Sequence, residues 1–131
     1  MSSRLGLEAG SHERPARALP EVLSMNRFVE TLVGSAFDTP RAALHASCRG
    51  EAQVAFARQV AMYLCHVELG LSFSAAGHLY GRDRTTASHA CHVIEERRED
   101  ASLDSLLDCL QRAIGLRRRL DADRRTAHDD Q

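Results

Sequence analysis

The sequence contains no long apolar run. None of its stretches approaches the roughly 18 consecutive apolar residues that a transmembrane helix requires. Residues 1–10 also lack the apolar core of a secretory signal, because Arg4 and Glu8 interrupt them. We therefore expect a protein of the cytoplasm.

Paired cysteines are also missing. The chain has four cysteines, and none forms the C-x-x-C pair of a zinc ribbon or a thioredoxin-like redox motif. Three of them lie among apolar residues at helical spacing. We interpret the cysteines as small hydrophobic side chains in a reducing compartment. The four are Cys48, Cys65, Cys91 and Cys109.

Lysine is absent and there is no excess of basic residues. All 17 basic residues are arginines, and the formal net charge is −1. Arginine suits bidentate contacts with phosphate or guanine, but a GC-rich coding sequence explains the bias equally well. The low net charge argues against a strong non-specific nucleic-acid binder. Charge alone therefore leaves the question of DNA binding open.

The chain shows neither strand-like alternation nor an internal repeat. Its 131 residues, 44% hydrophobic and 27% charged, suit one globular domain. Apolar residues recur at helical spacing instead, as Met25, Val29, Leu32 and Ala36 show. We predict an all-α protein with a single helical domain over residues 19–120. A disordered N-terminal arm, 1–18, and a disordered tail, 121–131, are expected to flank it.

The expected helices follow from this periodicity and from helix-ending residues. Gly70 and Gly81 are typical of helix ends, and Ser72 is a plausible N-cap. Asp83 or Arg84 begins a further helix. The expected ranges are 20–36, 41–46, 51–68, 73–80, 83–98 and a last helix from about 101 to 119.

Residues 72–98 have the layout of a helix-turn-helix, because a short helix, a glycine-containing turn and a second helix follow one another. Very small side chains at residues 75–77 would let two helices cross closely. The second helix opens with the polar residues 82–86, at the end where a recognition helix meets base edges. Local patterns of this kind are common in helical proteins, so the layout alone is a weak signal.

Two motifs make the signal more specific. Residues 57–64 read A-R-Q-V-A-M-Y-L, and residues 81–90 read G-R-D-R-T-T-A-S-H-A. They are similar to the A-R-Q-I-A-M-Y-L and G-R-D-H-T-T-V-x-H-A segments of the bacterial replication initiator DnaA, in the same order. The chain thus resembles the C-terminal domain of that family over residues 49–100. The resemblance implies a small helical bundle with a helix-turn-helix like those of the Trp repressor and DnaA.

The resemblance also implies which residues read bases. Asp83 would accept a hydrogen bond from a cytosine amino group, Thr85 would pack on a thymine methyl, and Thr86 would touch a base or a phosphate. Arg84 stands where the family signature has histidine, and it would bind guanine. Arg49 matches a basic loop that reaches the minor groove.

By the same resemblance, a second set of residues would contact phosphates. Arg58 matches the arginine of the R-Q pair, and Arg82 lies in the R-D segment. Ser72 lies at a helix N-terminus, which favours anions. His66 stands where a lysine or arginine is common, and it completes the predicted phosphate contacts.

Sequence-specific binding of double-stranded DNA is therefore the expected function. We expect a transcriptional regulator or a modulator of replication initiation, associated with the nucleoid. There is no G-x-x-x-x-G-K-[ST] phosphate loop, so we do not expect an initiator ATPase. The alternative is a protein-interaction module of the same machinery that has lost DNA binding. Besides DNA, the candidate partners are a second copy through the helix over residues 20–36, DnaA itself and a regulatory protein.

A metal enzyme is the third class of function. His89 and His92 are three residues apart, Cys91 lies between them, and Cys65 adjoins His66. No H-E-x-x-H motif completes a site, and His89 matches the DnaA signature. We expect no enzyme activity, no cofactor and no metal.

Overall fold

The computed structural model describes residues 19–46 and 51–129, and this part of the chain is helical without a strand. The prediction of an all-α fold is confirmed. The helices are α2 (Leu19–Phe37), α3 (Arg41–Leu44), α4 (Ala52–Val67), α5 (Phe73–His78), α6 (Arg84–Arg97) and α7 (Ala101–Asp129). The predicted arm, residues 1–18, and residues 47–50, which include Cys48 and Arg49, lie outside the described residues.

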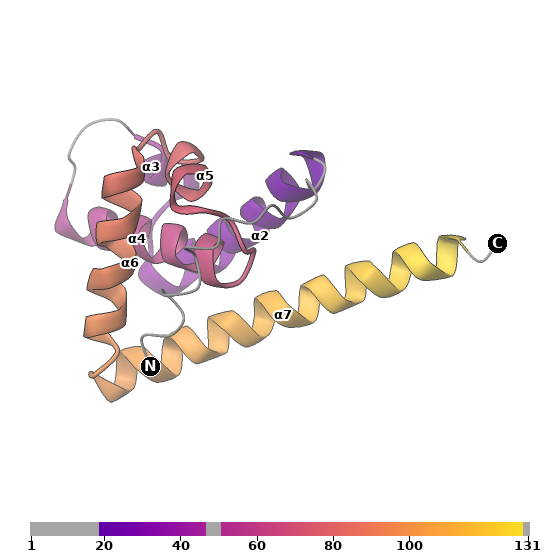
Figure 1. The fold of residues 1–131 in the computed structure, drawn as a ribbon. Helices are drawn as coiled ribbons and strands as arrows, with labels where there is room; N and C mark the ends of the chain where they lie inside the picture. The colour runs from indigo at the N-terminus through magenta and orange to yellow at the C-terminus, as the bar shows by residue number, and fades with distance from the viewer. Residues whose placement is uncertain (1–18, 47–50, 130–131) are drawn as a thin grey trace.

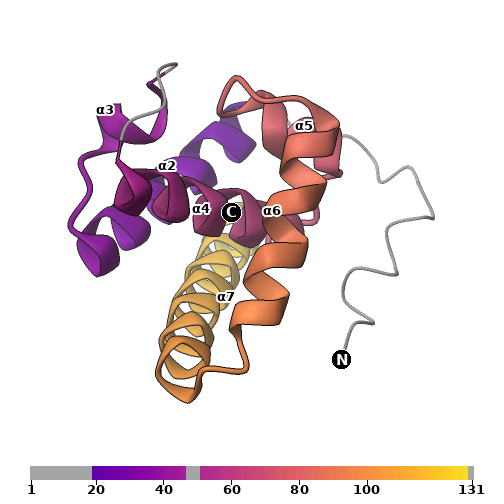
Figure 2. The same cartoon turned by 90° about the vertical axis from the view of Figure 1, so that its left-hand side faces the viewer.

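Helix α4 forms the centre of the molecule, with α2, α5, α6 and the start of α7 packed around it (Figures 1 and 2). Because α4 is covered on several sides, residues 57–66 are all buried except Gln59. Val60, Tyr63 and Leu64 of this helix are fully buried. The surrounding helices complete one continuous apolar core.

The end of α2 is a tight turn. Asp38 adopts a left-handed conformation with φ 52°, and the main-chain NH of Thr39 donates to the carbonyl of Gly34 at 3.0 Å. A Cβ at Gly34 would lie 2.7 Å from the Thr39 carbonyl oxygen. The glycine therefore allows the chain to fold back and lead into α3.

Helix α7 extends further than the sequence predicted. A disordered tail was expected from residue 121, but the helix continues to Asp129 (Figure 1). The apolar periodicity stops near residue 120, yet charged pairs support the helix beyond it. Asp121 pairs with Arg117 at 3.3 Å and with Arg124 at 3.6 Å. Arg125 reaches Glu21 on the first turn of α2 at 3.3 Å. The prediction of disorder over residues 121–129 is therefore wrong.

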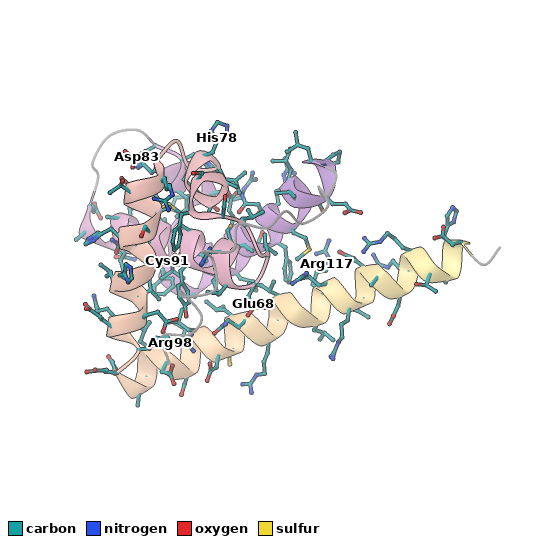
Figure 3. All side chains as sticks on the ribbon, in the orientation of Figure 1. Glu68, His78, Asp83, Cys91, Arg98 and Arg117 are labelled. Carbon is teal, nitrogen blue, oxygen red and sulfur yellow. The ribbon has the colours of Figure 1, made fainter. Side chains whose placement is uncertain are left out.

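Arg98 fixes the junction between α6 and α7. Its guanidinium pairs with Asp104 and with Asp108, each at 2.5 Å. It also donates to the hydroxyl of Tyr63 at 2.9 Å and to Gln111 at 2.8 Å. Figure 3 shows Arg98 where the two helices meet. Because these partners come from α4 and α7, Arg98 sets the angle at which α7 leaves the body.

The cysteines fall into two environments. Cys65 and Cys91 are fully buried, whereas Cys109 is exposed on α7. Burial raises the pKa of the Cys65 thiol, whose Sγ donates to Asn26 at 3.1 Å. Cys65 and Cys91 thus act as small core residues, as the sequence suggested. Cys109 does not, because it is exposed. No helix in the described part of the chain is long and apolar enough to cross a membrane.

Candidate nucleic-acid interface

Helices α5 and α6 are each capped by a side chain. The hydroxyl of Ser72 accepts from the main-chain NH of Ala75 at 3.0 Å, which confirms the predicted N-cap. The carboxylate of Asp83 accepts from the main-chain NH of Thr86 at 2.8 Å. Between the helices, Gly81 has φ 68°, a conformation that favours glycine. Local sequence signals therefore define both helices and the turn.

Gly77 marks the closest approach of the two helices. A Cβ there would lie 2.8 Å from the carbonyl oxygen of Arg82 and 2.9 Å from that of Asp83. It would also lie 3.3 Å from the Cβ of Ala87. The prediction that small residues permit a close crossing is confirmed at this position. Gly77 thereby holds the first turn of α6 against α5.

The polar residues at the amino end of α6 are exposed. Asp83, Arg84, Thr85 and Thr86 all face solvent, whereas Ala87 one position later is fully buried. Figure 3 shows Asp83 at the same end of the molecule as His78, the last residue of α5. The structure thus gathers four of the five predicted base-reading residues on one exposed helix end. The fifth, Arg49, lies outside the described residues.

The carboxylate of Asp83 is held in its ionised form. The hydrogen bond from the Thr86 main chain lowers its pKa, and the Thr86 side chain adds to the effect. The amino end of a helix also carries a partial positive charge, which favours a carboxylate there. An ionised Asp83 can cap α6 and still accept a hydrogen bond from an external amino group.

Arg82 ties the turn to the segment after α3. Its guanidinium donates to the carbonyl of Tyr80 at 2.8 Å and to the carbonyl of Ala46 at 3.3 Å. The side chain is half-buried. Ala46 directly precedes residues 47–50, which include Arg49. Arg82 therefore fixes Ala46, the last described residue before this segment, against the helix-turn-helix.

Arg58 and His66, both predicted to contact phosphates, are buried. Arg58 is only 6% exposed and donates to the carbonyls of Leu44 at 2.8 Å and Ala43 at 3.1 Å. His66 is 8% exposed, lies 2.7 Å from the Leu71 carbonyl and stacks on a phenylalanine. Both side chains face inward because α4 is covered on several sides. Contacts within the protein hold both side chains, and their phosphate contacts stay a prediction.

A buried polar network behind the helix-turn-helix was not predicted. Glu30 of α2 is 1% exposed and accepts from Arg41 at 2.8 Å and from Asn26 at 2.9 Å. One ring nitrogen of His45 lies 2.6 Å from it. The Tyr80 hydroxyl donates to Asn26 at 2.8 Å, so the network joins α2, α3 and the residues after α5.

Two opposing effects act on the Glu30 carboxyl. Burial by itself raises its pKa, but hydrogen bonds from Arg41 and His45 outweigh burial and leave the pKa below the ordinary value. The sequence did contain a signal for this network. Asn26 and Glu30 are polar residues four apart, between the apolar positions of the first helix.

The residues considered for a metal site are separated in the structure. His89 and His92 are exposed on α6, whereas Cys91 between them is buried. Within residues 19–46 and 51–129, no group of three potential metal-binding side chains comes together.

The capped helix pair, the glycine turn and the exposed polar amino end of α6 define a helix-turn-helix protein. The sequence profile of the bacterial DnaA protein helix-turn-helix matches residues 28–94, about half of the chain, and the chain belongs to this family. The family is a DNA-binding domain and not a catalytic one. The match also covers more than half of α2, a helix for which the sequence suggested no relative.

A curated relative agrees with the family assignment. The chain is 32% identical over 85 residues to the chromosomal replication initiator protein DnaA of Lachnoclostridium phytofermentans. The aligned region is 63% of this chain and 18% of the relative. The chain therefore spans less than a fifth of the length of the initiator that it matches.

Proposed function

We propose that this protein binds double-stranded DNA sequence-specifically through α5 and α6. The observation that carries the proposal is the run of exposed polar side chains from Asp83 to Thr86 at the amino end of α6. In a helix-turn-helix this end of the second helix enters the major groove. The caps of both helices and the close contact at Gly77 hold that end rigidly.

Each exposed side chain has a chemistry that suits a base edge. The ionised Asp83 accepts from the amino group of cytosine, and the planar fork of Arg84 donates to guanine. The Thr85 methyl packs on thymine, and Thr86 contacts a base or a phosphate. Since Arg84 replaces the histidine of the family signature, the preferred sequence should differ from the nine-base DnaA box at the base that this residue meets.

Phosphate contacts would orient the helix pair on the duplex. Ser72 is exposed at the amino end of α5, and Arg82 lies beside the turn. Arg49 lies three residues after Ala46, whose carbonyl accepts from Arg82, and we propose that Arg49 enters the minor groove. These contacts fix register without reading sequence.

The proposed biological role rests on the relative, a chromosomal replication initiator protein. We propose that the chain occupies DNA sites in the nucleoid, as a transcriptional regulator or as a modulator of replication initiation. Such a modulator would compete with the initiator for sites or bind it directly.

Self-association through α2 is a further part of the proposal. The second half of α2 packs on the core, but its first turns expose Leu19 at 65% and Leu23 at 46%. A second copy that packs on these leucines would supply a second recognition helix. Sedimentation velocity of the wild type and of Leu23→Gln tests this, and a monomer at all concentrations would contradict it.

Fluorescence anisotropy tests the DNA proposal. Duplexes with a DnaA box, a scrambled box and a random pool are titrated at two salt concentrations. We expect salt-sensitive binding that is tighter for one sequence, because phosphate contacts release counterions. No binding to any duplex at low salt would contradict the proposal and would favour a protein-interaction module.

A further inference from the structure

Helix α7 carries two apolar stripes. The first consists of Leu107, Leu110 and Ile114, which are buried against the core. The second stripe recurs at intervals of three, four, three and four residues. Its members, called the outer stripe below, are Leu106, Cys109, Ala113, Leu116 and Leu120.

Three members of the outer stripe are exposed, and Leu106 and Ala113 are half-buried. Leu106 packs partly on the core, but Cys109 is exposed, Leu116 is 51% exposed and Leu120 is 48% exposed. Figure 1 shows that the last turns of α7 extend beyond the other helices. Alternating intervals of three and four residues are the spacing at which a second helix packs along a first. The outer stripe therefore has the form of a helix-docking surface.

Arginines border the outer stripe on both sides. Arg112 and Arg119 are four residues before and three residues after Leu116, so they neighbour it on the helix surface. Arg117 and Arg124 flank Leu120 in the same way.

The arginines beside the outer stripe favour a partner of negative charge. Arg112 and Arg119 form no ion pair with any residue in the described ranges, and the side chain of Arg124 is 74% exposed. Arg117 and Arg124 share the single carboxylate of Asp121. A second copy packed along the stripe would bring arginines against arginines. An acidic helix would bring opposite charges together.

We propose that the outer stripe docks an acidic amphipathic helix of a partner protein. Apolar side chains of that helix would cover Leu116 and Leu120, and its Glu or Asp residues would pair with the bordering arginines. Figure 3 labels Asp83 at the DNA-binding end of α6 and Arg117 on α7, well apart. The partner and DNA would therefore bind at separate surfaces.

Model peptides test the proposal on the full chain. One helical peptide carries Leu at the a and d positions and Glu at e and g, and its counterpart carries Lys at e and g. We expect saturable binding of the Glu peptide only, by isothermal titration calorimetry. The double variant Leu116→Gln, Leu120→Gln should weaken binding about tenfold or more, because it removes the apolar contacts of two leucines with the peptide.

Two further variants make the test specific. Leu19→Gln with Leu23→Gln removes the other exposed leucines and should leave peptide binding unchanged. Arg112→Glu with Arg119→Glu should shift the preference to the Lys peptide. Circular dichroism checks that each variant stays folded.

Several outcomes would overturn the proposal. They are equal affinity for the two peptides, no saturable binding of the Glu peptide, and unchanged binding by the Leu116, Leu120 variant. The proposal would also be overturned if the wild type formed a dimer that this variant abolishes. Binding of phosphatidylserine vesicles by the protein, in place of the peptide, would overturn it as well. All measurements are made without DNA, so their failure leaves the proposed DNA function untouched.

Discussion

At the residue scale, Asp83 combines a structural role with the proposed recognition role. One carboxylate oxygen caps α6 through the main-chain NH of Thr86, and the side chain remains exposed. A residue in this position affects the stability of the helix end and the preference for a base at the same time. Substitutions that keep the cap can separate the two roles.

Asp83→Ser and Asp83→Ala should differ in stability. Serine is a good N-cap and should change the free energy of unfolding by only a few tenths of a kcal/mol, whereas alanine should lower it by about 1 kcal/mol. Both variants remove the carboxylate acceptor, so both should lose the preference for cytosine at the base it reads. Urea unfolding measures the first effect and anisotropy the second. Equal stability of the two variants would contradict the capping role.

Glu30 gives the protein a predictable response to acid. Because its pKa in the folded protein lies below the ordinary value of 4.5, ionised Glu30 contributes stability above about pH 4.5. That contribution is lost as the pH falls through the lower folded value. Glu30→Gln should therefore be less stable than the wild type at pH 7 by about 1–3 kcal/mol. Its stability should also fall less between pH 5 and 3 in urea titrations. Parallel pH profiles for the two proteins would contradict this account.

The sequence predicts the role of a residue best when the contacts that define this role are close in sequence. The caps at Ser72 and Asp83 involve partners three residues away, and the sequence predicted both. The role of Arg58 depends on carbonyls 14 and 15 residues distant, and a family motif alone assigned it to phosphate. Other helices bury its side chain, and local patterns do not contain that information.

At the element scale, the geometry of α5 against α6 depends on the missing side chain of Gly77. Gly77→Ala would place a Cβ under 3.0 Å from two main-chain carbonyl oxygens, which have little freedom to move. The gain in helix propensity is about 1 kcal/mol, but the clash should exceed it. We expect a net loss of about 1–3 kcal/mol in stability and weaker DNA binding.

Ser74→Ala is a matched control for this change. Ser74 lies on the same short helix and is exposed, so its replacement should alter stability by less than about 0.5 kcal/mol. Thermal unfolding followed by circular dichroism compares the two variants. A Gly77→Ala protein as stable as the wild type would show that the helix pair is less tightly packed than described.

The helix boundaries show what periodicity can and cannot predict. Helices α2, α4 and α6 have clear apolar stripes or caps, and the expected ends agree with the observed ends within one or two residues. The end of α7 was missed because residues 121–129 carry no apolar stripe. Pairs between Asp121 and two arginines, together with Arg125 and Glu21, support this segment instead.

At the scale of the whole molecule, the two proposed binding surfaces lie on different helices, α6 and α7. The helix-turn-helix packs on one side of α4, and α7 leaves from the opposite end of α6 (Figure 2). The fold class followed from the apolar periodicity, and the helix-turn-helix followed from its local layout and from two motifs. The hydrogen bond between Asn26 and Tyr80 could not be predicted in this way, because these two residues are 54 positions apart in sequence.

The most direct test of the account compares Arg84→Ala with Arg124→Ala. Arg84 is exposed on the recognition helix, whereas Arg124 is exposed in the last turns of α7. Anisotropy is measured on a duplex selected from a random pool by the wild type, and on the random pool itself. We predict that Arg84→Ala loses about 1–3 kcal/mol on the selected duplex and little on the pool, since a guanine contact reads sequence. Arg124→Ala should bind both as the wild type does. An Arg84→Ala protein that binds both duplexes like the wild type would contradict the assignment of α6 as the recognition helix.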